Sequence, residues 1–148
     1  MKTLKFTVEI EASPEAVWDH MLGDAGYRRW TAAFAEGSHF QGSWGPGDRI
    51  RFLAPNGDGI TSVIAESRPH ERLSIKHLGT ITGGIEDTES AEARKWAPSF
   101  ETYTFIDRGG CCELRVDLDC PPEFEPVMLK TWPEALAALK ALCEGRLG

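Results

Sequence analysis

The chain has 148 residues, of which 41% are hydrophobic and 26% charged, and this size and balance suit one globular domain with its own core. The formal net charge of -7 argues against nucleic acid or an anionic membrane as a partner, because both favour clustered Lys and Arg. We therefore expect a single domain over residues 1–148 without either kind of partner.

The first ten residues, MKTLKFTVEI, alternate between polar and apolar side chains and contain no continuous apolar run. This pattern excludes a signal peptide or a membrane span at this end, so a cytoplasmic location is the default expectation. Four cysteines lack any CxxC spacing, and we expect free, buried thiols in a reducing compartment. They are Cys111, Cys112, Cys120 and Cys143.

Residues 3–11 are predicted to form a strand, because polar and apolar residues alternate along them. Ser13 is a good helix N-cap and Pro14 suits the first helical position, so a helix should begin here. Gly23 should end that helix, and a second short helix is predicted over residues 24–30.

From Phe34 onward, glycines separate short alternating runs, which is typical of an antiparallel meander. The Asn-Gly and Asp-Gly pairs within 55–59 predict a hairpin turn, because they tolerate positive φ. The predicted strands are a run around Phe40 and Trp44, then 49–54, 60–67, 72–78, 100–107 and 111–120.

Residues 79–98 interrupt this rhythm with about twenty residues that lack a strand pattern, which is typical of a functional lid or a disordered insertion. Gly79, Gly83 and Gly84 are candidate hinges, and Ser90 should cap a short helix that ends near Trp96.

The last predicted element is a long helix from Pro122 to about Leu147, because its apolar residues recur at spacings of three and four. Pro133 should bend this helix. The predicted apolar face consists of Phe124, Val127, Met128, Trp132, Ala135, Leu136, Leu139, Leu142 and Cys143. Strands followed by a helix predict an α+β domain, in which a curved antiparallel sheet of about six to seven strands wraps around the C-terminal helix.

This order of elements resembles the START-like or birch-pollen-allergen-like (SRPBCC) superfamily, and within it the branch of the activator of heat-shock-protein-90 ATPase. The resemblance covers almost the whole chain. It is carried by the segment IEASPEAVW at 10–18, Trp30, the turn 45–48, the corner 69–73, and residues 132–142. It implies the helix-grip fold, whereas the 79–96 loop is longer and more acidic than the family's plain hairpin.

The resemblance implies three alternative functions. The first is non-enzymatic binding of a small hydrophobic molecule, such as a lipid, between the sheet and the long helix, with residues 79–96 as a lid. The second is an enzyme of the cyclase or hydratase kind, with His77 or Glu101 as acid or base. The third is a co-chaperone-like partner of a heat-shock ATPase. The oligomeric state stays open, a homodimer among the options.

Catalytic motifs are absent from the sequence. Its histidines, His20, His39, His70 and His77, form no HExxH or HxH pattern, so we expect no metal site. No GxSxG, GxGxxG or GxxxxGK[ST] motif occurs, which argues against hydrolase, dinucleotide-binding and NTPase functions. We expect no cofactor.

Two positions carry the candidate chemistry. His77 shares the parity of Leu73 and Ile75, so it should face the apolar side, either as a ligand contact or as a structural histidine. Glu101 and Tyr103 share one face of their strand, and the pattern leaves open which face is interior. If theirs is, a carboxylate and a phenol share an apolar cavity; otherwise they are an exposed Glu and a rim Tyr.

Aromatic residues give the stronger signal, because five tryptophans exceed what a core of this size requires and Trp favours pockets and interfaces. We expect Met128 and Trp132 to border a guest and the residues after Pro133 to be packed shut. The predicted ligand-binding residues are Trp30, Phe34, Phe40, Trp44, Phe52, His77, Trp96, Tyr103, Met128 and Trp132.

Overall fold

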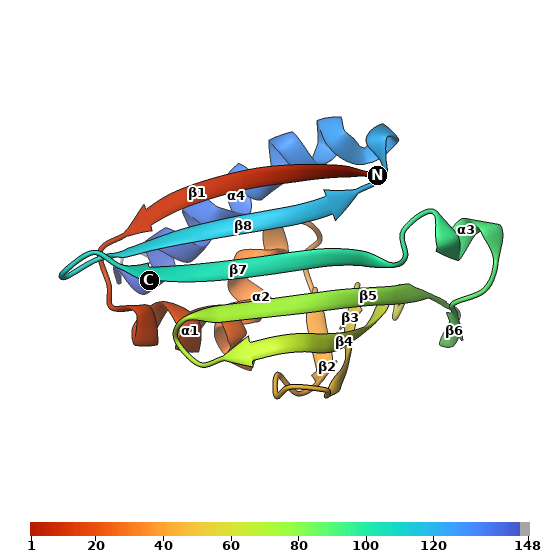
Figure 1. Cartoon of the computed structure of the whole chain (residues 1–148), viewed down its shortest axis with the longest axis horizontal. Coiled ribbons are helices and arrows are strands. Elements are labelled where there is room, and N and C mark those ends of the chain that lie inside the picture. The colour runs from red at the N-terminus through yellow and green to blue at the C-terminus, as the bar shows by residue number, and fades with distance from the viewer. Residues whose placement is uncertain (146–148) are drawn as a thin grey trace.

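A computed structural model describes residues 1–145, in which one curved antiparallel sheet packs against the long helix α4 (Glu125–Cys143) (Figure 1). The strand order is β1-β8-β7-β5-β4-β3-β2, and β6 pairs with the end of β5. The strands are β1 (Lys2–Ile10), β2 (His39–Gly42), β3 (Arg49–Leu53), β4 (Gly59–Arg68), β5 (Arg72–Thr82), β6 (Ile85–Asp87), β7 (Ser99–Asp107) and β8 (Cys112–Cys120). The other helices are α1 (Pro14–Leu22), α2 (Asp24–Trp30) and α3 (Ala91–Arg94), with single 3-10 turns at Thr31–Ala33 and Pro122–Phe124.

The predicted fold class is confirmed, because the molecule is α+β with its sheet curved around the C-terminal helix. The first and last strands of the chain lie side by side, paired from Lys2 opposite Cys120 to Ile10 opposite Cys112. The sheet has eight strands rather than six or seven, and the additional strand is the short β6.

Both predicted early helices are present, and local chemistry explains their ends. The Ser13 hydroxyl accepts a hydrogen bond from the Ala16 N–H at 3.2 Å, as an N-cap should. At Gly26 in α2, a Cβ atom would lie only 1.8 Å from the carbonyl oxygen of His20. Glycine is therefore required where α2 crosses the end of α1.

The prediction for residues 79–98 is wrong in its first part. The strand β5 continues to Thr82, turns at Gly83 and Gly84, and returns as β6. These glycines have φ values of 59° and 81°, so they form the tight turn of a hairpin rather than hinges. In the second part, α3 is capped by Ser90 as predicted.

The long helix is shorter at both ends than predicted, because residues 122–124 form a 3-10 turn and α4 ends at Cys143. Leu147 lies outside the described residues. Val127 was assigned to the apolar face but is 50% exposed. Successive helical residues point about 100° apart, so Val127 falls outside the arc that Met128 and Leu139 share.

The core lies between the concave side of the sheet and the helices α1, α2 and α4, and its most buried members include Ile10, Val17, Leu114 and Leu139. All four cysteines are free, but Cys111 and Cys143 are only half-buried, contrary to the expectation of burial. Within residues 1–145, no helix is both long and apolar enough to cross a membrane.

Candidate functional site

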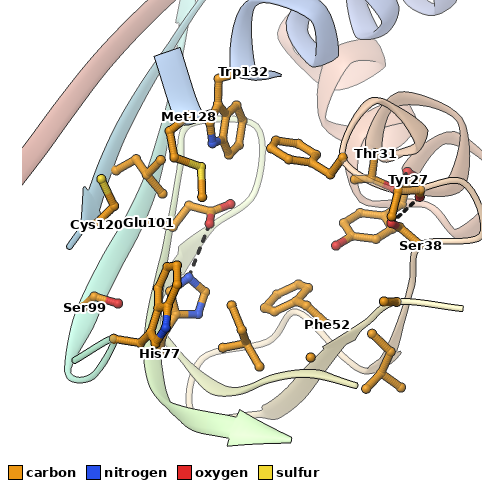
Figure 2. Close-up of a pocket in the computed structure, with 18 of the residues that line it drawn as sticks. Tyr27, Thr31, Ser38, Phe52, His77, Ser99, Glu101, Cys120, Met128 and Trp132 are labelled. Carbon is orange, nitrogen blue, oxygen red and sulfur yellow. Dashed lines mark hydrogen bonds and ion pairs between the residues drawn. The ribbon is translucent and has the colours of Figure 1, made fainter. Parts of the chain in front are cut away.

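A cavity of about 280 Å³ lies between the sheet and the first half of α4 (Figure 2). Its walls come from α2 and the residues after it, β3, the start of β4, β5, β7, β8 and α4. The lining residues are Tyr27, Trp30, Thr31, Phe34, Ala35, Ser38, Phe52, Leu53, Ala54, Asp58, Gly59, Ile60, His77, Trp96, Ser99, Glu101, Tyr103, Leu118, Asp119, Cys120, Met128 and Trp132.

Trp132 is the central aromatic residue of the α4 wall, and it is only 3% exposed. Its ring centroid lies 5.2 Å from that of Phe34, 5.9 Å from that of Trp30 and 6.4 Å from that of Tyr103. Trp132 therefore contacts aromatic residues of the sheet, of α2 and of the loop after α2, on the α4 side of the cavity.

The two halves of α4 differ as the sequence predicts. Met128 and Trp132, before Pro133, border the cavity. Ala135, Leu136 and Leu139, after it, are at most 3% exposed and do not line the cavity. Pro133 itself is exposed on the outer side of the helix.

Trp96 connects the segment after β6 to the mouth of the cavity. Its ring packs at a tilt of 42° against Phe124, with centroids 4.3 Å apart, just before α4 begins. Trp96 also lines the cavity. Trp96, which lies in a mostly polar segment, thus packs against an aromatic residue at the start of α4.

The face of β7 that carries Glu101 and Tyr103 points inward, which settles the orientation that the sequence left open. Tyr103 is 2% exposed, whereas Phe100 on the other face is 41% exposed. In the sheet, Glu101 lies opposite Ile75 of β5 and Leu118 of β8. The carboxylate therefore enters the cavity from its floor (Figure 2).

A chain of hydrogen bonds links four polar side chains, of which all but Glu101 are buried. The Ser62 hydroxyl lies 2.7 Å from Nδ1 of His77, and Nε2 of His77 lies 3.3 Å from Oε1 of Glu101. The Tyr103 hydroxyl donates to Oε2 of the same carboxylate. The distances fit an imidazole that accepts from Ser62 and donates to Glu101.

A sheet irregularity places Ser62 at the start of this chain. The pairing of β4 with β5 shifts register between Thr61 and Ser62, and both side chains are buried despite being consecutive. Ser62 does not line the cavity, so it orients His77 from behind rather than facing a guest. Phe52 packs edge-on against the imidazole, with centroids 6.0 Å apart.

Two tyrosines keep their protons at this site. Burial, and then the charge of Glu101, raises the pKa of both Tyr27 and Tyr103 well above the usual value of about 10. Both are therefore neutral phenols at physiological pH. Figure 2 shows the Tyr27 phenol entering the cavity opposite Glu101, and its oxygen has no hydrogen-bond partner among residues 1–145.

Most of the predicted site residues lie around one space. Those that line the cavity are Trp30, Phe34, Phe52, His77, Trp96, Tyr103, Met128 and Trp132. Whether they bind a ligand stays a prediction. Phe40 and Trp44 do not line it: they pack behind Tyr27 at centroid distances of 5.1 and 6.3 Å.

Phe40 and Trp44 lie one layer outside the cavity because β2 is the edge strand and the Tyr27 ring stands between it and the space. The Trp44 indole instead donates to the Leu22 carbonyl at 3.0 Å. Sequence reasoning missed Tyr27, although its spacing of three from Trp30 on a helix puts both on the same side.

Metal chemistry has no candidate centre here. Within the part of the chain that the structure describes, His, Cys, Asp and Glu side chains form no group of three that could hold a metal ion. His77, Glu101 and the two phenols offer hydrogen bonding and proton transfer at the cavity.

No protein-family model matches this sequence, and no curated protein sequence matches it. Solved structures do match. Protein MLL2253 from Mesorhizobium loti is 16% identical with a TM-score of 0.73, and the match covers 99% of each chain. The Aha1 dimer from Colwellia psychrerythraea is 18% identical with a TM-score of 0.72 over 100% of each chain. DynU16, from the dynemicin biosynthetic locus, is 16% identical with a TM-score of 0.70 over 97% of this chain and 48% of that one.

Likeness at this level of identity shows the fold. The fold defined by the sheet and α4 is the helix-grip fold that the sequence predicts, and these neighbours share it. Function does not follow from the fold, so it has to be argued from the cavity.

Proposed function

We propose that the protein binds a small hydrophobic molecule in the cavity between the sheet and α4. The observation that carries this proposal is an aromatic-walled space of about 280 Å³ bordered by Trp30, Phe52 and Trp132. It is about twice the ~150 Å³ of an engineered apolar cavity that binds benzene. A guest of two fused rings with a short polar arm matches this volume.

The segment from β6 to Trp96 acts as a cover in this proposal, because both of its ends are held. At one end, the Glu86 carboxylate pairs with Arg51 at 2.6 Å and Arg49 at 3.4 Å. At the other end, Trp96 packs at a tilt against Phe124. Exchange of the guest would then require Trp96 to leave the mouth.

Titration calorimetry with naphthylethanol, a neutral two-ring probe, tests binding. Met128→Trp should fill the cavity and weaken binding by more than about tenfold, the effect of ~1.4 kcal/mol. Val127→Trp is the matched control, because Val127 is adjacent to Met128 in the sequence but is 50% exposed and lies outside the cavity. It should leave affinity unchanged.

Absence of heat with naphthylethanol, together with no small molecule released from the denatured purified protein in mass spectrometry, would overturn the proposal. Equal affinity in the wild type and Met128→Trp would place the binding elsewhere on the molecule and also overturn it.

A second candidate is acid–base catalysis on a bound molecule, as in a cyclase or hydratase. One observation favours it, namely the chain in which Ser62 orients His77 and His77 contacts Glu101. On a substrate identified by co-purification, His77→Gln should abolish turnover while naphthylethanol still binds. Unchanged turnover would remove His77 from this role.

No structural feature of residues 1–145 specifically supports a co-chaperone function or a homodimer. The Colwellia Aha1 structure is a dimer, but that protein is only 18% identical to this chain. Stimulation of a reconstituted heat-shock ATPase, and sedimentation of the free protein, would test the two ideas.

A further inference from the structure

The charged side chains that line the cavity are predominantly acidic. Its ionisable side chains, apart from the neutral phenols and the Cys120 thiol, are Asp58, His77, Glu101 and Asp119, and no Lys or Arg occurs among the described lining residues. A guest therefore enters a field set by carboxylates, without the arginine that usually receives a carboxylate or a phosphate.

Glu101 is largely enclosed, with a side chain only 17% exposed. Its two oxygens accept from His77 and Tyr103, but a carboxylate has about four lone-pair sites, so acceptor capacity remains. A carboxylate in an apolar site is unfavourable unless donors or a cation compensate it. A positively charged guest would supply that compensation.

The other two acids lie at the rim and are already bonded. Asp119 accepts from the Thr3 hydroxyl at 2.7 Å and from the Phe100 N–H at 3.0 Å. Asp58 accepts from the Gly83 N–H at 3.1 Å. They add negative potential at the mouth, and Glu101 is left as the direct acceptor.

Tyr27 supplies a second acceptor on the opposite wall. Its side chain is 8% exposed and its oxygen has no partner among the described residues. A phenol oxygen can accept from a donor placed between it and Glu101. The faces of Trp30, Trp132 and Phe52 around this position attract cations in addition to burying apolar surface.

We infer that this cavity selects a hydrophobic cation, specifically a protonated aromatic amine whose ammonium lies between Glu101 and Tyr27 and whose rings lie against the tryptophans. This inference rests on the proposed ligand binding and names the class of that ligand. An apolar carboxylate of the same size is disfavoured, because it would bring a second anion to Glu101.

Three probes of matched shape test the inference by calorimetry at neutral pH: naphthylethylamine, naphthylethanol and naphthylacetate. Hydrogen bonds to charged groups contribute about 1.5–3 kcal/mol, so the amine should bind at least about tenfold more tightly than the alcohol. The acetate should bind most weakly. This comparison uses the wild-type protein and needs no substitution.

Glu101→Gln should lower the affinity for the amine by about tenfold and change that for the alcohol by less than about threefold. Glu113→Gln is the matched control: it removes the same charge from β8, where the carboxylate pairs with Arg108 and Arg115 outside the cavity. It should leave all three affinities unchanged.

Equal binding of the three probes, or tightest binding of the acetate, would overturn the inference while supporting the proposed function. Absence of binding by all three would overturn both. If Glu101→Gln does not fold, Tyr27→Phe keeps the ring and removes the opposite oxygen. A selective loss of amine affinity then supports the inference, and unchanged amine affinity contradicts the assigned position.

Discussion

The interior beneath α4 has two ends that are built differently. At the packed end, Ala135, Leu136 and Leu139 are buried in the hydrophobic core. At the cavity end, Met128 and Trp132 border an open space with aromatic walls and a largely enclosed Glu101. Under the proposed function, different turns of one helix provide stability and binding, because close packing leaves no room for a guest.

The sharpest test of this division is to shorten a side chain at each end. Leu139→Ala should lower the free energy of unfolding by about 2–5 kcal/mol, because Leu139 is fully buried and its removal opens a new void. Met128→Ala should cost less, because Met128 already borders an empty space. Urea denaturation measures both, and equal losses would contradict the division.

The sequence predicts the packed end well because that end depends on local periodicity. Alternation in β1 and β8 and the three-and-four spacing in α4 identify Ile10, Leu114 and Leu139 as core without tertiary information. The helix start at Ser13 is equally local, since the hydroxyl caps its own helix.

The cavity end depends on how distant segments meet, which periodicity does not report. Both faces of β7 carry aromatic residues, with Phe100 on one and Tyr103 on the other, so only the pairing with β5 and β8 decides that Glu101 is inside. Ser62 reaches His77 through a register shift that no sequence pattern marks. The prediction that Phe40 lines the cavity is wrong, because alternation indicates which face of a strand a residue is on but not whether another side chain, here Tyr27, lies between it and the cavity.

Alkaline pH should weaken the packed end before the cavity end. Burial raises the pKa of Cys112 to about 11 and that of Cys143 to about 12. Below the ordinary cysteine pKa of about 8.5, both thiols are protonated in the folded and unfolded chain. As pH rises from about 8.5 to these raised folded values, the thiols ionise in the unfolded chain but not in the folded one, so stability is lost.

Urea midpoints of the wild type and Cys143→Ala, measured from neutral to strongly alkaline pH, check this prediction. The wild type should lose stability faster as pH rises, because the variant lacks the Cys143 thiol and its raised pKa. Parallel curves would show that Cys143 does not contribute. Tyr27 and Tyr103 act in the same direction at still higher pH, and they are common to both proteins.

The smallest expected effect concerns the cover of the cavity end. Hydrogen bonds from Thr61 and Arg51 hold the pKa of the Glu86 carboxyl below its usual range. Its contribution is therefore present above the unfolded pKa of about 4.3 and is lost as pH falls through the lowered folded value. Because the group is partly exposed, Glu86→Gln should reduce stability by less than about 1 kcal/mol at neutral pH.

Hydrogen exchange shows whether this ion pair holds the cover in place. In Glu86→Gln, amides of β6 (Ile85–Asp87) should exchange faster, while those of β7 stay protected by pairing on both sides. Glu89→Gln is the control, because that exposed carboxylate makes no ion pair within residues 1–145. Faster exchange in both variants would mean that net charge, rather than the contact of Glu86 with Arg51, governs the cover.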